Sequence, residues 1–190
     1  IICILLFSPI MLLFLFLVFI VDLKNPIFKG SRVGKNGKLF NIYKIRSMNI
    51  GSENASSTTA KNDIRVTKIG RFIRLLKFDE LPQFFNILFG SMSFVGPRPE
   101  IKEYVDLYTH EEKQCLNVKP GITDYSSIRF ISLFNKVGYG DAHENYVKYF
   151  FKEKNRLRIK YVKDISFFCD LNILLKTFFA LVLRLFNFEK

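Results

Sequence analysis

The chain begins with a long run of nonpolar positions. Ile1–Val21 contains no charged side chain, and Ser8 carries its only hydroxyl group. As a helix that rises about 1.5 Å per residue, the run would reach about 32 Å, close to the thickness of one hydrocarbon core. No basic segment precedes it and no small-residue cleavage site lies before Asp22, so a signal peptide is not favoured. Because the chain starts at Ile rather than Met, we expect residues 1–21 to be an N-terminally truncated membrane helix.

Pro9 interrupts this nonpolar run. A proline inside a helix lacks the amide donor and pushes against the preceding turn, so a kink or a break is expected there. The hydroxyl group of Ser8 can satisfy a carbonyl that the break leaves free. Two topologies remain open, a span and a re-entrant hairpin that returns to the same face. In both, the positive-inside rule places the basic stretch that follows, and with it residues 22–190, in the cytosol.

The alternation of residues 25–63 predicts a β-hairpin followed by a loop. Leu39–Ile45 alternates between nonpolar and polar positions, and Gly30, Gly34 and Asn36-Gly37 supply turn signals before it. The segment Asn49–Asp63 is small and polar, which predicts a loop that can act as a lid.

Residues 69–100 change from a helical to an extended pattern. Ile69–Gly90 shows helical periodicity that is interrupted near Asp79, and Pro82 suits the first turn of a new helix. Ser93–Glu100 is predicted to be extended or turned, because prolines on both sides of Arg98 exclude a helix.

The remaining pattern is mostly helical. After a Pro-Gly turn in Val118–Thr123, Glu144–Tyr161 predicts a basic, aromatic helix. In Leu171–Phe188, at about 100° per residue, polar side chains share one arc and the rest is nonpolar. The polar residues are Asn172, Lys176, Thr177, Arg184 and Asn187. This pattern predicts a helix lying in a bilayer interface, although a core helix of a soluble domain shows the same stripe. The elements together predict an α+β fold, mostly helical, with a small β-hairpin or sheet.

Composition and charge narrow the function classes. The 190 residues carry a net charge of +12 yet are 49% hydrophobic, which excludes a disordered basic tail. The three cysteines are widely spaced, so a disulfide scaffold or a structural zinc site is not indicated. Between Lys24 and Lys77, thirteen basic residues stand against Glu53 and Asp63, so this stretch alone holds +11. A nucleic-acid binder, a membrane-surface protein and an enzyme for anionic substrates all remain.

One acidic pair is the first candidate for chemistry. Asp79 and Glu80 are adjacent, with Arg71, Arg74 and Lys77 just before them. A carboxylate can serve as a nucleophile toward phosphorus, a metal ligand or a general base. The alternative is that both acids only begin a helix, where acidic residues are common.

Three basic residues are candidates for phosphate binding. The prolines beside Arg98 restrict its guanidinium, which suits a bidentate grip on phosphate, unless it pairs with Glu100 instead. Lys44 and Arg46 share one face of the predicted strand, so they can bind a diphosphate or form a solvated edge. His110 and His143 have no metal-ligand spacing. The sequence contains no GxSxG, Walker or GxGxxG motif, so a serine hydrolase, a P-loop enzyme and a Rossmann dehydrogenase receive no support.

The order of these motifs resembles the bacterial sugar transferases, the monotopic phosphoglycosyl transferases of polyprenol-phosphate-linked glycan synthesis. The centre of the resemblance is residues 65–100, RVTKIGRFIRLLKFDELPQFFNILFGSMSFVGPRPE. It extends to FKGSRVGKNGKLFNIYKIRSM before that run and to VKPGIT and YVKDISFFCDL after it. Several spaced motifs agree in order over nearly the whole chain.

The resemblance implies a monotopic fold whose single membrane helix is re-entrant and broken at Ser8-Pro9, which favours the hairpin. It implies transfer of a sugar 1-phosphate from a UDP-sugar to undecaprenyl phosphate, with release of UMP and a requirement for Mg²⁺. It also implies a location on the cytoplasmic face of the bacterial inner membrane, in a pathway of exopolysaccharide, capsule or lipopolysaccharide synthesis.

By motif position, the resemblance gives Asp79 the role of nucleophile, forming a covalent phosphosugar–aspartate, and we expect Asp79 also to be the metal ligand. Glu80 would act as acid/base or orient Asp79. The expected substrate-binding cations are Lys44, Arg46, Arg71, Arg74 and Arg98. Further expected partners are anionic membrane lipid and a second copy of the chain, rather than nucleic acid.

The chain departs from the family pattern at Gly30, where Gln is common, at Ser91, where Asp is common, and at Asp124-Tyr125. These departures leave the acidic pair intact and leave the sugar open. Two rivals are a membrane-tethered nucleic-acid binder that uses the basic stretch and a non-catalytic scaffold that engages anionic lipid.

Overall fold

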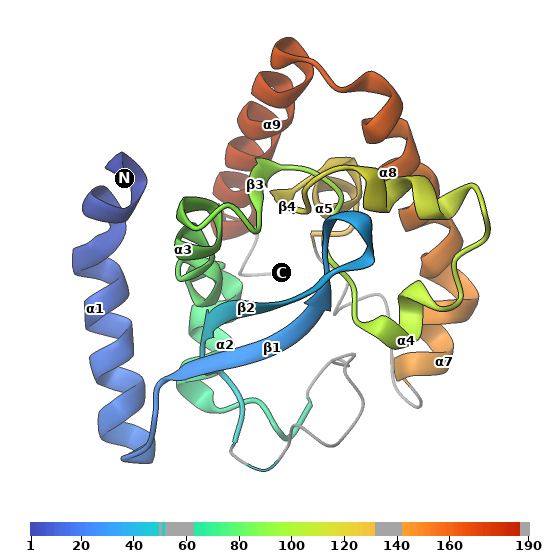
Figure 1. The fold of residues 1–190 in the computed structure, drawn as a ribbon. Helices are drawn as coiled ribbons and strands as arrows, with labels where there is room; N and C mark the ends of the chain where they lie inside the picture. The colour runs from blue at the N-terminus through green and yellow to red at the C-terminus, as the bar shows by residue number, and fades with distance from the viewer. Residues whose placement is uncertain (50, 52–62, 132–141, 187–190) are drawn as a thin grey trace.

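The computed structural model describes residues 1–49, 51, 63–131 and 142–186. Most of the predicted lid, Asn49–Asp63, lies outside the described residues. The observed architecture is α+β, with helices around two small two-stranded sheets (Figure 1).

The nonpolar N-terminal run forms helix α1 (Ile2–Asp22), which lies along one side of the molecule (Figure 1). Phe14 and Val18 are buried against Ile45 and Ile73, whereas most other large side chains of α1 are exposed. The helix is long and nonpolar enough to cross a membrane.

The helix continues through Pro9, so the expected break does not divide it into two helices. Pro9 lacks the amide that would donate to the carbonyl of Leu5, four residues earlier. The hydroxyl group of Ser8 donates to that carbonyl instead, at 2.9 Å. This substitute bond explains how the helix accommodates the proline without dividing into two helices.

The predicted hairpin is confirmed. Strands β1 (Ile27–Val33) and β2 (Leu39–Ile45) pair antiparallel through the short turn η1 (Lys35–Gly37). Asn36 and Gly37 both adopt positive φ, which explains the Asn-Gly pair at this turn.

The helical pattern of residues 69–90 divides where it was predicted to. Helix α2 (Lys68–Leu75) ends before η3 (Phe78–Glu80), and Pro82 precedes α3 (Gln83–Leu88) as its N-cap. Gly70 of α2 lies directly on the end of the hairpin, because a Cβ there would lie 2.0 Å from the carbonyl oxygen of Ser47.

A second sheet follows. Strands β3 (Ser93–Val95) and β4 (Gly121–Thr123) pair in parallel, and Gly121 permits the close approach, since its Cβ would lie 2.1 Å from the Gly96 nitrogen. Between them the chain forms α4 (Lys102–Val105) and η4 (Glu112–Asn117), and α5 (Tyr125–Arg129) follows β4. The extended Ser93–Glu100 segment is confirmed, while the predicted Pro-Gly turn leads into a strand.

The last helices differ in detail from the pattern. The region predicted as one helix, Glu144–Tyr161, contains α7 (Ala142–Tyr146), a π-helical segment η5 (Val147–Phe151) and α8 (Lys152–Asp164). Helix α9 (Phe167–Phe186) begins four residues before the predicted Leu171. Ile173 of α9 packs against Val95 and Tyr161, so one face of the helix belongs to the core.

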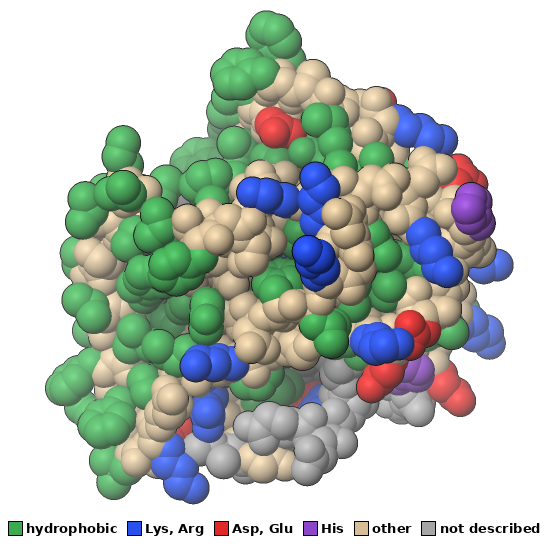
Figure 2. All heavy atoms as spheres, viewed as in Figure 1, with side chains coloured by type: hydrophobic (Ala, Val, Ile, Leu, Met, Phe, Trp, Pro, Cys, Tyr) green, Lys and Arg blue, Asp and Glu red, His purple; other side chains and the backbone are tan. Residues whose placement is uncertain are grey.

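A broad nonpolar surface remains uncovered on the described residues. Figure 2 shows hydrophobic side chains gathered over α1 at the left and over α9 at the top. On α9 these exposed residues are Phe167, Phe168, Leu171, Leu174, Leu175, Phe178, Phe179 and Leu183. Soluble monomers rarely expose so large a nonpolar area, which marks a surface of interaction.

Candidate active site

The acidic pair lies in η3, between two helices. Lys77 has a positive φ of 59°, which ends α2 and turns the chain so that Asp79 and Glu80 enter the interior. Both are buried, with 5% and 8% of their surfaces exposed. Buried carboxylates are costly unless they are paired, so this placement argues against the alternative that they only decorate a helix start.

Three cations surround Glu80. Its Oε1 lies 3.4 Å from Nζ of Lys44, 3.7 Å from Nζ of Lys77 and 2.5 Å from Nη2 of Arg98. These residues come from β2, the turn between α2 and η3, and the Pro97–Pro99 segment, so Glu80 joins three parts of the chain. Burial raises the pKa of Glu80, but the charges of Arg98, Lys44 and Lys77 outweigh it and hold that pKa well below the usual value.

Asp79 is less fully paired. Its Oδ2 lies 3.9 Å from Nζ of Lys44, whereas its Oδ1 is buried without a hydrogen-bond partner among the described residues. Burial raises the pKa of Asp79, and the neighbouring Glu80 charge adds to the rise while Lys44 opposes it. Two adjacent carboxyl groups thus differ in chemistry: Glu80 is held as an anion, and Asp79 keeps one unsolvated oxygen available.

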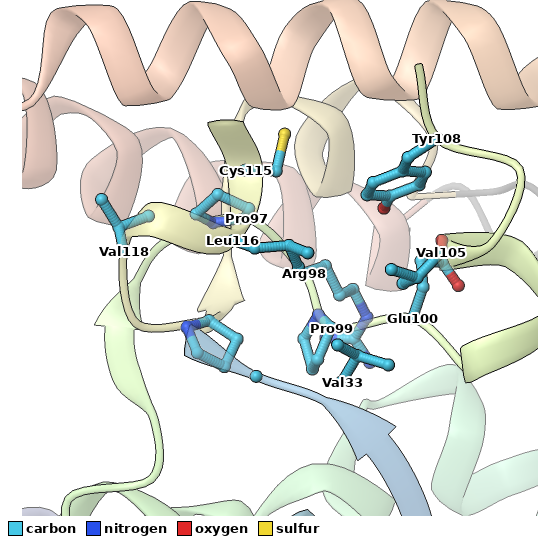
Figure 3. Close-up of a pocket in the computed structure, with 12 residues that line it drawn as sticks. Val33, Pro97, Arg98, Pro99, Glu100, Val105, Tyr108, Cys115, Leu116 and Val118 are labelled. Atoms are coloured by element: carbon cyan, nitrogen blue, oxygen red, sulfur yellow. The ribbon is translucent and has the colours of Figure 1, made fainter. Parts of the chain in front are cut away.

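The Pro97-Arg98-Pro99 segment is fixed at several points. Nη1 of Arg98 donates to the carbonyl of Ile122 at 2.8 Å, and its backbone N–H donates to Asp124 Oδ2 at 3.3 Å. Both prolines line a small cavity together with Val33 and Leu116 (Figure 3). Its volume of about 10 Å³ leaves room for about one water. Arg98 and Glu100 also line this cavity.

Glu100 does not pair with Arg98, which excludes that alternative. It binds Arg158 at 2.5 Å and Lys154 at 3.6 Å, and accepts a hydrogen bond from the Tyr146 hydroxyl group at 2.6 Å. Burial raises the pKa of Glu100, but the charges of Arg158 and Lys154 outweigh burial and lower that pKa to about 2. This second charged cluster anchors the chain immediately after Pro99.

The other predicted cations, Arg46, Arg71 and Arg74, differ in whether they face the interior of the protein or its surface. Arg74 donates from Nε to the hydroxyl group of Ser47 at 2.7 Å; burial lowers its pKa, and Asp79 partly offsets this effect. Nε of Arg46 is buried without a hydrogen-bond partner among the described residues. Arg71 is exposed on α2, and no ion pair within the described ranges joins it to the acidic pair. The structure therefore assembles Lys44 and Arg98 around the carboxylates but leaves Arg71 at the surface.

Some residues that contact or position the site residues were not among those predicted from the sequence. Lys77 contacts Glu80, and Ser47 holds Arg74. Asp124 is fully buried, caps α5 through the Ser127 N–H and positions the Arg98 backbone. Asp124 directly precedes α5, and an Asp in that position is a common N-cap, so the sequence does carry a signal for it. Ser91, one of the departures, donates to the Asn86 carbonyl.

The site offers a metal ion few protein ligands. No group of three or more His, Cys, Asp or Glu residues converges within the described part of the chain. Mg²⁺ commonly binds through one or two carboxylates together with substrate phosphates and water. The unpaired Oδ1 of Asp79 supplies one such oxygen, so the donor set fits a magnesium ion that the substrate helps to hold.

Comparisons with known proteins agree on one family. A model described as "Bacterial sugar transferase" matches residues 1–184. The sugar transferase EpsL of Bacillus subtilis is 37% identical over 166 residues, covering 86% of this chain and 74% of that protein.

Two longer relatives carry specific names. One is a UDP-N-acetylgalactosamine-undecaprenyl-phosphate N-acetylgalactosaminephosphotransferase of Aeromonas hydrophila, 37% identical over 90% of this chain and 39% of its own length. The other is a UDP-glucose:undecaprenyl-phosphate glucose-1-phosphate transferase of Klebsiella pneumoniae, 35% identical over 92% of this chain and 36% of its own length. This chain thus spans less than half of each. With nearly its full length matched by the family model, the chain belongs to the bacterial sugar transferase family.

Proposed function

We propose that this protein transfers a sugar 1-phosphate from a UDP-sugar to undecaprenyl phosphate and releases UMP. The observation that carries the proposal is the buried, unpaired Oδ1 of Asp79 beside a cluster of cations. Relatives named as undecaprenyl-phosphate sugar phosphotransferases support the same reaction class. The nucleotide sugar and the lipid phosphate are both anions, which the net charge of +12 favours.

The reaction proceeds in two displacements. A carboxylate oxygen of Asp79 attacks the sugar-proximal phosphorus; the new O–P bond forms as the bond to the UMP oxygen breaks, and UMP leaves with that electron pair. An oxygen of undecaprenyl phosphate then attacks the same phosphorus and releases the Asp79 carboxylate, giving undecaprenyl diphosphate-sugar. One nucleophile thereby serves two substrates in turn.

The surrounding charges support this chemistry. Lys44, Lys77 and Arg98 surround Glu80, the residue next to Asp79. In this proposal they offset the negative charge that gathers on the transferred phosphoryl group, and fixed cations there lower the barrier. The depressed pKa of Glu80 makes it a poor proton donor at neutral pH. Glu80 therefore holds the three cations in position and orients the neighbouring Asp79.

Mg²⁺ belongs to the proposal. Asp79 would hold it through the oxygen not used in attack, and the substrate phosphates would complete its ligands. When bound, the ion offsets phosphate charge. Lys44 opposes the rise in the pKa of Asp79 and thus keeps the carboxylate available to both roles.

The nonpolar surface supports a monotopic location. We propose that α1 enters the cytoplasmic leaflet and that the uncovered side chains of α9 lie in the bilayer interface, with anionic lipid facing the basic residues. Since α1 is continuous through Pro9, a re-entrant path would require the helix to bend at Ser8-Pro9 within the bilayer. The site then lies where a soluble nucleotide sugar and a membrane lipid both reach it, in synthesis of a capsule, exopolysaccharide or lipopolysaccharide.

The proposal is tested by UMP release from a panel of UDP-sugars with undecaprenyl phosphate and Mg²⁺ in detergent. The wild-type protein should release UMP with at least one donor, and Asp79→Asn should abolish release. Asp106→Asn is the matched control, because Asp106 is exposed and pairs only with Lys102 at the surface among the described residues. Salt-sensitive binding of DNA or RNA that is indifferent to Asp79, with no turnover of any donor, would favour the nucleic-acid rival instead.

A further inference from the structure

The face of α9 that packs on the protein body leads toward the site. Ile173 is fully buried, and one turn later the Thr177 hydroxyl group lies 2.7 Å from that of Thr123, the residue before Asp124. Arg184 follows Thr177 by seven residues, about two helical turns, and therefore lies on the same face. Figure 1 shows this end of α9 passing behind β3 and α3 toward the middle of the molecule.

One nitrogen of the Arg184 guanidinium, Nη1, is buried and has no hydrogen-bond partner in the described part of the chain. A buried guanidinium N–H without an acceptor is unfavourable, and a bound anion would remove that cost. Phosphate is the anion that arginine suits best, since its planar fork matches two phosphate oxygens.

The charge of Asp79 also acts on Arg184. Burial lowers its pKa, and the negative charge of Asp79 opposes that effect. No ion pair within the described ranges joins the two residues directly. A buried donor on α9 and the buried, unpaired Oδ1 of Asp79 thus lie within electrostatic range of each other without forming a contact.

We propose that Arg184 binds a substrate phosphate group while it reacts at Asp79. This inference rests on the proposed function and adds a ligand-binding residue from the membrane-facing helix. Either substrate can supply the phosphate. Leu183, the residue before Arg184, is exposed on the nonpolar surface of α9, so Arg184 lies next to the proposed lipid side, which favours the phosphate of the lipid acceptor.

Steady-state kinetics of Arg184→Met and Arg184→Lys test the inference, with each substrate varied in turn. Lys176→Met is the matched control, because Lys176 is an exposed cation on the same helix. Arg184→Met should lower kcat/KM by about tenfold to a hundredfold, the effect of losing one charged hydrogen bond, while Arg184→Lys should retain part of the activity. A rise in KM for undecaprenyl phosphate identifies the lipid as the source, and a rise for the UDP-sugar identifies the nucleotide.

A binding measurement separates this inference from the reaction. In the Asp79→Asn protein, undecaprenyl phosphate should raise the unfolding temperature, and adding Arg184→Met should reduce that rise, whereas Lys176→Met should not. The inference is overturned if Arg184→Met matches Lys176→Met within twofold in kcat/KM for both substrates, or if Arg184→Lys and Arg184→Met lose activity equally. If the wild-type protein releases no UMP, the proposed function fails, and an unchanged rise in unfolding temperature would then overturn the role of Arg184.

Discussion

Arg98 and Glu80 form an ion pair in which Nη2 of Arg98 lies 2.5 Å from Oε1 of Glu80. The pair joins the Pro-Arg-Pro segment to the acidic pair, and the second guanidinium nitrogen is fixed on the Ile122 carbonyl. Arg98 is thereby oriented before any phosphate arrives, which lowers the cost of ordering it on binding.

Replacing Arg98 should therefore impair the reaction strongly. Arg98→Met should lower kcat/KM by about a hundredfold, equivalent to about 2.7 kcal/mol, and Arg98→Lys should lose less. The control is Arg156→Met, since Arg156 is an exposed partner of Glu153 on α8. Assays of UMP release check the series, and wild-type kinetics in Arg98→Met would rule out a phosphate-binding role.

The acid limb of the pH profile should respond to Lys44. Asp79 attacks only when ionised, so kcat/KM should fall as the pH drops through its pKa, which burial raises. Lys44 opposes that rise, so Lys44→Met should move the acid limb to higher pH. Lys38→Met, an exposed change on the same hairpin, should leave it in place. A limb that stays fixed or moves to lower pH in Lys44→Met contradicts the assignment.

Close packing at Gly70 should couple stability to the site. A Cβ at position 70 would overlap the Ser47 carbonyl, and Ser47 holds Arg74 through its hydroxyl group. Gly70→Ala should lower the free energy of unfolding by about 1–3 kcal/mol and reduce activity, whereas Lys68→Ala on the exposed side of α2 should change stability by less than about 0.5 kcal/mol. Denaturant unfolding in detergent measures both, and equal stability of the two variants would contradict the contact.

The Glu100 cluster should make stability fall in acid. The pKa of Glu100 in the folded protein, about 2, lies below its ordinary value of 4.5, so the stabilisation is complete above pH 4.5 and is lost as the pH falls toward 2. Glu100→Gln should therefore cost about 3 kcal/mol at neutral pH, and the difference from wild type should shrink between about pH 4.5 and 2. Unfolding curves of both proteins across this pH range measure the difference in their free energies of unfolding. A difference that is independent of pH would exclude an electrostatic origin.

Local patterns predicted much of the fold. Alternation located β2 at its observed bounds, Leu39–Ile45, and the combination of Pro82 with the interrupted periodicity located η3 between α2 and α3. These features depend on neighbouring residues. The parallel pairing of β3 with β4 does not, because each strand has three residues and the contact joins distant segments. The continuity of α1 through Pro9 was not predictable, because a proline inside a helix allows a kink or a break and the Ser8 hydrogen bond suits both.

The candidate site was only partly predictable for the same reason. The motif gave Asp79, Glu80 and Arg98, and the structure brings these together with Lys44. Whether a cation on α2 faces inward depends on the packing of that helix, so Arg71 and Arg74 could not be separated by spacing alone. Asp124 fixes the backbone of Arg98, and the charge of Asp79 acts on Arg184. Both relationships join residues far apart in the sequence, so local patterns could not predict them.

Intact-protein mass spectrometry after incubation with the UDP-sugar and Mg²⁺, without acceptor, tests the proposed two-step transfer most directly. The wild-type protein should gain the mass of one sugar phosphate, peptide mapping should locate it on Asp79, and undecaprenyl phosphate should remove it. Asp79→Asn should gain nothing. An adduct that persists in Asp79→Asn, or UMP release that requires the acceptor and leaves no adduct at any time, would contradict Asp79 as the nucleophile.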